Sequence, residues 1–452
     1  MTVAACLWLG LFPLLQGGTY AHITHDKWII MLCLTGMTLI CFCTDLTIGL
    51  IARRRRAVRL FPFPVRSPLA WLPLILASAL MFQTAVSCLF SGARAETFLI
   101  GSSARYEGFV SQFCYYALFC FFFFSHVRLK PVLLSAAAGV TAFFVIVMLQ
   151  RAGGNPFGLY PSGRSYAQNP EFQGTIGNVD MGTGYLLILA ALFLYGLVSA
   201  VSGTRNAGGN RPEQGKAKPG RLIMRILYLV CLSAALLITL YLIVTMDVQF
   251  GAISLAVLTV FTILRFLPIP KWFRLPLLIL LIIIVLLVVW LWPGHGGGVW
   301  ELHEIFHGRS RMSFGSNRVA VWIYSLGLAR ENLLFGGGSG SFVTRFNQYL
   351  SDHGLVIPDE QDGKRLPNYF DNPHNEYIQQ LTDHGLPAML LFLALLLFAV
   401  FRHCKAGFPF LAPCSAAVLC YAVQAFFSFS VCLVAPMFWV ILALSSHDNS
   451  SL

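Results

Sequence analysis

The succession of apolar segments constrains the fold of this chain more than any other feature of its sequence. Twelve such runs can be read along the 452 residues, and most reach the ~17–25 residues that a helix needs to cross a bilayer. Charged residues make up only 11% of the chain, against about 25% in a soluble domain. We therefore predict an all-α polytopic membrane protein with about twelve transmembrane helices. The predicted membrane segments are residues 3–18, 28–51, 69–90, 109–125, 132–150, 181–201, 222–245, 249–266, 275–293, 386–401, 409–428 and 430–446.

The first apolar run has the length of a signal peptide. It lacks a basic segment in front of it and is followed closely by a second long run, so we keep it as a membrane helix. The chain then divides into three parts. Helices one to nine would occupy residues 1–293, a large polar loop residues 294–376, and helices ten to twelve residues 377–452.

The positions of lysine and arginine set the expected orientation. Nineteen of the 31 cations fall in alternate loops, whereas the opposite short loops hold five and the segment 294–376 holds seven. Because cytoplasmic loops carry the excess of Lys and Arg, we expect both termini in the cytoplasm and residues 294–376 outside the membrane. The net charge of +12 is thus a topology signal and gives no reason to expect nucleic acid binding.

The cysteines give no sign of a disulfide framework or a metal site. Eleven of the twelve lie in apolar runs, and Cys404 lies in a predicted cytoplasmic loop. Cys41 and Cys43 are too close together, in too apolar a setting, to form part of a zinc site. We predict neither a disulfide nor a bound metal.

Two shorter polar loops are predicted on the outer side. The loop 91–108 ends with Arg105 and Glu107, which could pair with each other or border a lipid headgroup site. The loop 151–178 is rich in Gly, Pro, Asn and Ser, so its backbone is irregular. Since irregular backbone at membrane depth must be buried in protein or line a wet cavity, we expect this loop to form a cavity wall.

The outer segment 294–376 is long enough for two or three helices lying on the membrane. Asn317–Arg330 has apolar residues at helical spacing and is predicted to be one of them. The run Gly336–Gly340 follows and lacks the Gly-Lys-Ser/Thr ending of a nucleotide-binding loop. We expect it to serve as a hinge or to allow a close approach between two backbones.

The stretch that begins at Asp371 joins this segment to the apolar run 386–401. Asp371 or Asn372 could cap a helix, and the next residue, Pro373, suits a first turn whose free N–H groups favour an anion. Polar side chains then follow: His374, Asn375, Glu376, Tyr377 and Asp383. This combination suggests acid–base chemistry on a charged, lipid-borne substrate. The alternative is a structural turn with interfacial anchors.

Two of these regions resemble a known family. Asn372–Leu391 resembles the signature of the O-antigen ligase and polymerase superfamily, in which a Pro/Ser-His-Asn-x-Tyr-Leu pattern opens a late membrane helix. Upstream, Arg318 and Trp322, followed by Leu334–Phe342, are similar to the family's Arg…Trp…Gly-x-Gly-x-Phe run.

Two earlier segments extend the resemblance to roughly residues 90–400. Gly174–Tyr185 is similar to a Gly-Thr-x-Gly-Asn-x-Asn segment, and Gly101–Gly108 to the form seen in Gram-positive members. The chain departs from the family at three places: Gln249-Phe250-Gly251 replaces Ser-Arg-Gly, Asn178-Val179-Asp180 replaces Asn-x-Asn, and Asp383 replaces a glutamate.

The resemblance implies a multispan glycosyltransferase of the GT-C type in the bacterial cytoplasmic membrane. Such proteins move a glycan from an undecaprenyl-diphosphate carrier to an acceptor at the outer surface. They use no metal, no nucleotide sugar and no other cofactor. The implied partners are the lipid-linked donor, a glycan, lipid or cell-wall acceptor, and membrane lipids.

A mechanism for this transfer can be assigned to residues as a hypothesis. Arginines would stabilise the departing diphosphate, with Arg318 as first candidate and Arg105, Arg151 and Arg164 as further ones. His374 would be the general base on the acceptor hydroxyl, oriented by Glu376 or Asp383. The remaining predicted substrate-binding residues are Asn178, Trp322, Asn375 and Tyr377.

The sequence leaves several functions open. A polymerase and a ligase share these motifs, and the Gram-positive form of Gly101–Gly108 favours polymerisation or wall-glycan transfer. A lipid-linked glycan transporter or flippase is a second class, although polar residues here gather on one face instead of at mid-membrane. A non-catalytic component of envelope assembly is a third, because the arginine expected at Phe250 is missing.

Overall fold

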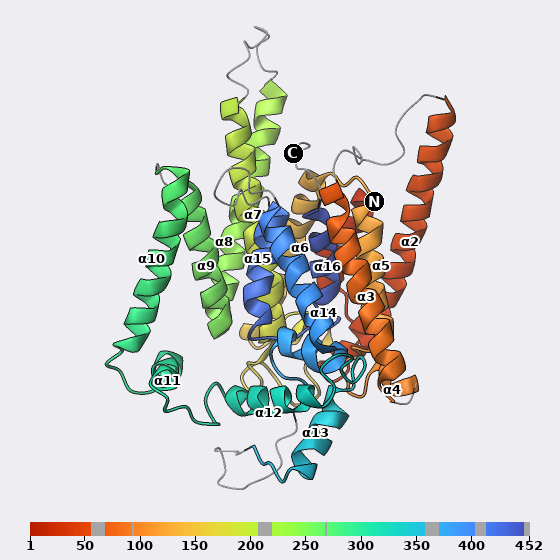
Figure 1. Cartoon of the computed structure of the whole chain (residues 1–452). Helices are drawn as coiled ribbons and strands as arrows, with labels where there is room; N and C mark the ends of the chain where they lie inside the picture. Colours follow the sequence, from red (N-terminus) through yellow and green to blue (C-terminus); the bar gives the residue numbers. More distant parts are fainter. Residues whose placement is uncertain are drawn as a thin grey trace.

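The computed structural model describes residues 1–55, 68–92, 95–206, 219–266, 269–357, 370–402 and 413–446. Its longest helices run side by side in one bundle, with short helices gathered at one end (Figure 1). Seven helices of the described residues are long and apolar enough to cross a membrane. They are α2 (Ile23–Arg55), α3 (Leu72–Phe90), α6 (Leu129–Arg151), α7 (Val179–Asn206), α8 (Pro219–Met246), α10 (Lys271–Trp290) and α14 (Glu376–Phe401).

The other five predicted membrane runs form shorter apolar helices of 10–17 residues. They are the consecutive turns α1 (Thr2–Cys6), η1 (Leu7–Leu11) and η2 (Phe12–Leu14), and the helices α5 (Phe109–Phe123), α9 (Gln249–Phe266), α15 (Pro413–Ala425) and α16 (Ala435–Leu444). The chain is therefore an all-α, multi-pass membrane protein, as predicted. That all twelve runs cross the bilayer remains a prediction.

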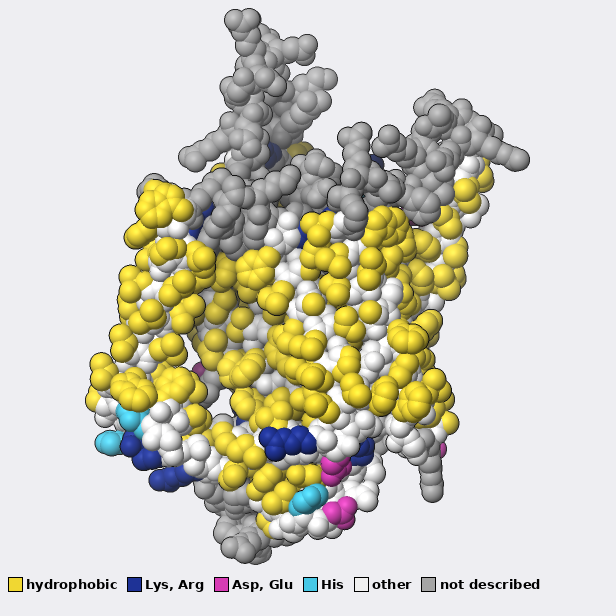
Figure 2. All heavy atoms as spheres, viewed as in Figure 1, with side chains coloured by type: hydrophobic (Ala, Val, Ile, Leu, Met, Phe, Trp, Pro, Cys, Tyr) yellow, Lys and Arg dark blue, Asp and Glu magenta, His cyan; other side chains and the backbone are white. Residues whose placement is uncertain are grey.

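The bundle has a buried centre and a lipid-facing periphery. Every described residue of α16 is buried, and α7 is the most buried of the seven long helices. None of the apolar window of α10 is buried, and α10 stands at the edge of the bundle in Figure 1. Apolar side chains cover the bundle between its two ends in Figure 2, as expected for a surface that faces acyl chains.

The first apolar run is part of the packed core. Trp8 and Phe12 are buried, and the carbonyl oxygen of Gly10 would lie 2.3 Å from a Cβ added at Gly139 of α6. Two glycines thus let the backbones of these helices meet directly.

Short elements fill the end of the bundle where the polar segment lies. The segment 294–376 contributes α11 (Gly297–Phe306), α12 (Arg318–Glu331) and α13 (Phe342–Asp352). The helix predicted at Asn317–Arg330 and the expected number of surface helices are therefore confirmed for the described residues. Also at this end are α4 (Ala95–Ile100), η4 (Pro156–Gly158) and the antiparallel pair of β1 (Phe172–Gln173) and β2 (Gly177–Asn178). The short helix η3 (Pro68–Trp71) leads into α3 at the opposite end, where Trp71 packs against Phe123.

Some sequence predictions fall on residues outside the described part of the chain. These are Cys404, residues 358–369 of the outer segment 294–376, and parts of the loops that carry the counted lysines and arginines, namely residues 56–67, 207–218 and 403–412.

A break in α14 determines how the polar end is assembled. Gly385 has φ 85° and ψ 173°, so the helix turns sharply within its assigned length. The break frees backbone groups, and the run Leu333–Gly338 binds them: Gly337 N donates to Thr382 O (3.0 Å) and Leu386 N donates to Leu333 O (2.7 Å). Helix breaks persist inside membrane proteins when other groups satisfy the freed backbone in this way.

The glycine run makes this docking possible. A Cβ at Gly336 would lie 2.5 Å from the carbonyl carbon of Asp383, so only glycine allows the two backbones to approach. Helix α3 supports the same junction, because Gln83 Nε2 donates to Leu334 O (2.8 Å) and His384 O (2.9 Å). Of the two predicted roles for Gly336–Gly340, the structure shows the close backbone approach.

Candidate functional site

The segment before α14 has a different cap from the one predicted. Asn375 is the N-cap, and its Oδ1 accepts a hydrogen bond from Ile378 N at 3.0 Å. Asn372 Oδ1 instead accepts from His374 N (2.8 Å), while Asp371 is bound to Arg105. The prediction that Asp371 or Asn372 caps the helix is therefore wrong, because both side chains bind elsewhere. His374 precedes the helix, in a left-handed conformation with φ 48°.

His374 lies in a partly buried position beside an aromatic ring. Its imidazole meets the Phe429 ring edge-on, with centroids 5.4 Å apart. Burial lowers the pKa of His374 to about 4; the positive charges of Arg318 and Arg105 lower it further, and the Asp371 carboxylate opposes them. Among the described residues, none lies within hydrogen-bond distance of its buried Nδ1. At neutral pH the ring is uncharged and keeps a nitrogen free to accept a proton.

Arg318 is the first residue of α12, and its positive charge lowers the pKa of His374. It follows Ser316 and Asn317, both in left-handed conformations, which turn the chain into the helix. Its guanidinium acts on His374 and also on Asp180, in the first turn of α7. Its buried Nε finds no acceptor within the described ranges of the chain. Arg318 is thus close enough to His374 for its charge to act on the imidazole, and both side chains keep hydrogen-bonding capacity within the described part of the chain.

Trp322 ties these two residues into one unit. Located one helical turn after Arg318, it donates from Nε1 to the carbonyl of Pro373 at 2.9 Å. The ring also packs edge-on against Phe426, which follows α15. Trp322 therefore holds α12 against the segment that carries His374.

Arg105 approaches the same place from the loop before α5. Its Nε donates to Asp371 Oδ2 at 2.6 Å, and its guanidinium lies over the Phe429 ring, 4.8 Å from the centroid. The pairing of Arg105 with Glu107 that the sequence suggested does not form. Glu107 is buried instead and accepts hydrogen bonds from Tyr115 Oη (2.7 Å) and Gln112 Nε2 (3.2 Å).

The two carboxylates predicted to orient His374 have other neighbours. Glu376 accepts a hydrogen bond from Tyr421 Oη at 2.8 Å. Asp383 lies beside Gly340 and Gln379, and the Arg345 guanidinium acts on it electrostatically. The carboxylate that acts on the His374 pKa is that of Asp371, which the sequence reading had treated only as a cap.

A comparison of the sequence with models of known protein families finds a match. Residues 227–393 match the family model described as O-antigen ligase. The chain carries an O-antigen ligase domain. The match runs from α8 into α14 and includes Arg318, Trp322 and His374. This match supports a membrane enzyme of the O-antigen ligase or polymerase type. No curated protein matches it.

The remaining predicted site residues lie outside the O-antigen ligase domain or have structural partners. Arg151 donates to Gln173 Oε1 (3.0 and 2.8 Å) and to Thr245 O (3.3 Å), which fastens the β1–β2 hairpin to α8. Arg164 is exposed in its loop. Asn178 Oδ1 accepts from Asp180 N at 2.7 Å at the start of α7.

Two further expectations change in the structure. Tyr377, predicted to contact a sugar, donates from its Oη to Ala422 O at 2.6 Å and so joins α14 to α15. The stretch Gly174–Gly177, predicted to form a cavity wall, is buried in protein. Tyr20 Oη donates to Gly174 O (2.7 Å), and Thr175 Oγ1 donates to Pro13 O (2.7 Å).

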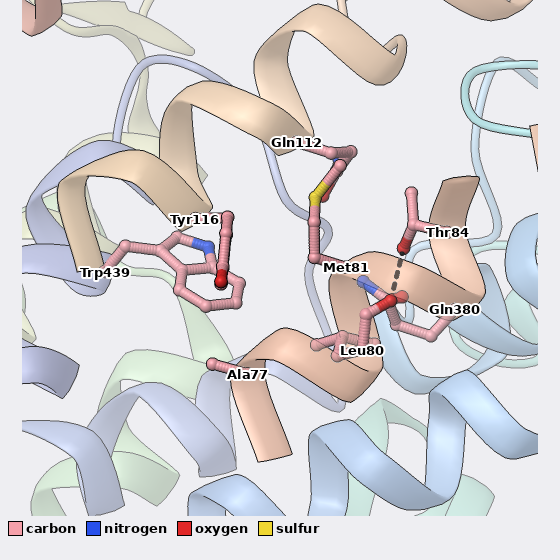
Figure 3. Close-up of a pocket in the computed structure, with 8 residues that line it drawn as sticks. All are labelled: Ala77, Leu80, Met81, Thr84, Gln112, Tyr116, Gln380 and Trp439. Atoms are coloured by element: carbon pink, nitrogen blue, oxygen red, sulfur yellow. Dashed lines mark hydrogen bonds between the residues drawn. The ribbon is translucent and has the colours of Figure 1, made fainter. Parts of the chain in front are cut away.

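Two hollows lie against the first part of α14, which is the end of the O-antigen ligase domain. One is mainly apolar, encloses about 260 Å³, and has no charged residue in its wall (Figure 3). Its wall consists of Ala77, Leu80, Met81, Thr84, Gln112, Tyr116, Gln380 and Trp439. The other is polar, with about 280 Å³ counting the part open to solvent, and is lined by Ser103, Arg105, Glu107, Gly340, Phe342, Asp371, Asn372, Gln379, Asp383, Phe429 and Ser430.

The wall of the polar hollow includes residues that the sequence reading missed. Phe429 and Ser430 were assigned to the boundary between two membrane runs, yet they lie between α15 and α16 and reach the polar end. The signal was present as three serines at 428, 430 and 415 in an otherwise apolar region. Phe342 had been noted only as the end of the family-like run Leu334–Phe342, and Gln379 gave no signal, because amide residues are common in helices of any role.

Proposed function

We propose that this protein transfers a glycan from an undecaprenyl-diphosphate carrier to an acceptor hydroxyl at the outer face of the cytoplasmic membrane. The observation that carries the proposal is the electrostatic proximity of His374 and Arg318. At the polar end of a membrane bundle, the charge of Arg318 acts on an uncharged imidazole, and His374 Nδ1 and Arg318 Nε each lack a hydrogen-bond partner among the described residues.

The reaction needs a group that stabilises negative charge. As the bond between the anomeric carbon and the diphosphate oxygen breaks, charge builds up on the leaving undecaprenyl diphosphate. A guanidinium binds such oxygens through paired, charge-assisted hydrogen bonds. Arg318 supplies it from a partly buried position, where electrostatic stabilisation is stronger than in water.

The acceptor needs a base. Its hydroxyl oxygen attacks the anomeric carbon and forms the new glycosidic bond, while its proton passes to His374. Burial, together with the charges of Arg318 and Arg105, makes His374 a weak base in the free protein. A bound diphosphate would offset their charge and raise the His374 pKa, so the base strengthens when the donor is in place.

The shape of the molecule offers a route for a lipid-linked donor. Figure 2 shows the apolar surface hollowed directly above α12, between α10 on one side and the centre of the bundle on the other. Arginine and histidine side chains are gathered below this level. A polyprenyl chain could lie against the apolar walls while its diphosphate meets the first turn of α12.

The test is a transfer assay with the lipid-linked glycan that accumulates in cells lacking this protein. We expect His374→Ala to lower kcat by about 10²–10⁴-fold, the usual contribution of a general base. Arg318→Gln should cost about 10²–10³-fold, as for one preorganised donor. Arg309→Gln is the matched control, since Arg309 is an exposed arginine of the same segment that binds only Glu304 in the described structure.

The pH dependence provides a second readout. Because His374 stays uncharged down to a pKa of about 4, the acid limb of kcat/KM should lie well below pH 6.5. The acid limb of kcat should lie at higher pH than the acid limb of kcat/KM. The reason is that kcat reports the enzyme with its donor bound, and the donor's diphosphate raises the His374 pKa. A folded His374→Ala protein with wild-type turnover would refute the role of the base.

The break in α14 also suits a second candidate, a transporter of lipid-linked glycans. Broken helices often form the moving sites of transporters. Here the break is fixed by backbone hydrogen bonds from Leu333–Gly338, which favours a static site. Thiol labelling decides between them: a cysteine introduced at Ser103, in the wall of the polar hollow, that reacts from the cytoplasmic side during turnover would favour transport.

A further inference from the structure

The backbone around His374 is held in a strained conformation by its neighbours. His374 has φ 48°, in the left-handed region that residues other than glycine seldom adopt. Asn372 Oδ1 accepts a hydrogen bond from His374 N at 2.8 Å. On either side, Trp322 Nε1 donates to Pro373 O at 2.9 Å, and Asn375 caps α14. A strained backbone persists where its surroundings over-determine it, so the position of the imidazole depends on these contacts.

The contact made by Asn372 leads back to Arg105. Asn372 Nδ2 donates to Asp371 Oδ1, and Asp371 Oδ2 accepts from Arg105 Nε at 2.6 Å. The two oxygens of the Asp371 carboxylate thus bind different partners. Hydrogen bonds in series therefore connect the Arg105 guanidinium with the backbone of His374. Both charged side chains are partly buried, with 31% of Arg105 and 24% of Asp371 exposed, so salt and water screen the pair only in part.

Phe429 links Arg105 to the side chain of His374 as well. The Arg105 guanidinium lies over the Phe429 ring, 4.8 Å from its centroid. The His374 imidazole meets the same ring edge-on, with centroids 5.4 Å apart. A cation over an aromatic face is attracted to it, so the guanidinium and the ring hold each other in place. Arg105 therefore has one connection to the backbone of His374 and another to its imidazole.

The same pair sets the charge around the imidazole. Three charged groups act on His374: Arg318 of α12, Arg105 of the loop before α5, and Asp371 of the segment before α14. Phe429, from the segment between α15 and α16, adds an uncharged surface. Burial is the main cause that lowers the pKa of His374; the two arginines lower it further, and the Asp371 carboxylate raises it. Opposite charges in contact largely offset each other at a third group, so the loss of either partner leaves the other unopposed.

We propose that Arg105 and Asp371 form a positioning pair, which holds His374 in the geometry that proton transfer requires. The sequence suggests Arg105 as a residue that binds the diphosphate, but its Nε and the face of its guanidinium are taken up by protein groups. A base must lie within hydrogen-bond reach of the proton it accepts, and small displacements are costly. The benefit for proton transfer rests on the proposed function, whereas the coupling of the pair to His374 does not.

Transfer assays over a range of pH test the pair. Arg105→Gln and Asp371→Asn should each lower kcat by about 10–100-fold through misplacement of His374, with the KM for the donor nearly unchanged. The double variant should lose no more activity than the less active single variant, because the two residues act as one unit. The acid limb of kcat/KM should move to higher pH in Arg105→Gln and to lower pH in Asp371→Asn. A purely structural role would not move the two variants in opposite directions.

Titration of the His374 ring gives a readout that does not depend on turnover. The full-length, detergent-solubilised protein would carry isotope-labelled histidine, and the NMR signal of His374 is assigned with His374→Gln. Arg105→Gln should raise the midpoint of this titration, and Asp371→Asn should lower it. Asp371→Asn keeps the shape of the side chain, so the pair can be tested even if Arg105→Gln does not fold. The matched control is another arginine–carboxylate pair, Arg309 and Glu304, also 2.6 Å apart, whose Gln variants should change neither kcat nor the acid limb.

Several outcomes would overturn the proposal. One is a His374 titration that the two single variants leave unchanged or move in the same direction; another is a double variant whose loss is the product of the single losses. A third is an Arg105→Gln protein with a raised KM for the donor and an unchanged kcat, which would make Arg105 a donor-binding residue. Wild-type turnover in His374→Ala, together with opposite shifts of the His374 titration in the pair variants, would refute the proposed function alone.

Discussion

At the scale of single residues, the polar end combines groups whose protonation is set by burial. His374 is kept uncharged because its surroundings penalise the imidazolium, and Glu107 because its surroundings penalise the carboxylate. Burial raises the pKa of Glu107 to about 8, although hydrogen bonds from Tyr115 and the Cys432 backbone act in the opposite direction. Near neutral pH both residues are therefore mainly in their neutral forms.

The shift of Glu107 has a consequence for stability that can be measured. The unfolded chain loses this proton above pH 4.5, whereas the folded chain keeps it up to about pH 8. Folded protein therefore loses stability as pH rises through that window, by up to roughly 4 kcal/mol in total. Glu107→Gln imitates the neutral form, so its Tm advantage over the wild type should grow from pH 5 to pH 8.

The control for this prediction is Glu304→Gln. Glu304 is partly buried, and its hydrogen bonds with Arg309 lower its pKa, so it carries no titration between pH 5 and pH 8. The Tm difference between Glu304→Gln and the wild type should be the same at pH 5 and at pH 8. If the Tm difference between Glu107→Gln and the wild type also stays constant from pH 5 to pH 8, then Glu107 is already ionised in the folded protein.

At the scale of elements, the broken helix α14 holds the site together. Its first part carries Gln379 and Asp383, and the break allows residues 333–338 to bind the freed backbone groups. The same run leads through Gly340 into the wall of the polar hollow, and Ser102 N donates to Gly340 O at 2.9 Å. One junction thus fixes α14, the outer segment and the loop of Arg105 relative to one another.

Gly385→Ala should therefore destabilise the whole protein. The residue has φ 85°, and an added Cβ would lie 2.3 Å from Leu334 O, so backbone must shift. We expect a loss of about 3 kcal/mol, seen as a lower Tm in detergent. Gly36→Ala in α2 is the control, since nothing lies within 4 Å of its added Cβ and alanine favours a helix there. Equal Tm values for both variants would contradict the account of the break.

At the scale of the whole molecule, the sequence predicts the helices better than it predicts their contacts. Apolar length determines membrane helices locally, and helical spacing was enough to find α12. The pairing of Arg105 with Asp371 joins residues 266 positions apart and follows only from the folded arrangement. The break at Gly385 was hidden by the apolar residues after it. Asn375 is the cap because Asp371 binds the distant Arg105 and Asn372 binds the backbone of His374.

The orientation of the molecule is the last property that the sequence predicts and that the proposed function requires. All the short helices of segment 294–376 lie at one end of the bundle, and the chain begins at the other (Figure 1). The excess of Lys and Arg in alternate loops predicts that the end with α12 lies outside the cytoplasm. Only then can His374 meet a donor presented on the outer leaflet.

Reporter fusions test this orientation directly. Alkaline phosphatase joined after Ser310 should be active, because that enzyme matures only outside the cytoplasm, whereas a fluorescent protein joined there should be dark. Joined after Arg402, at the far end of α14, the two reporters should behave in the opposite way. The reverse pattern at both positions would place His374 and Arg318 in the cytoplasm. The donor would then have to be met before export, and the proposed reaction could not occur where it is assigned.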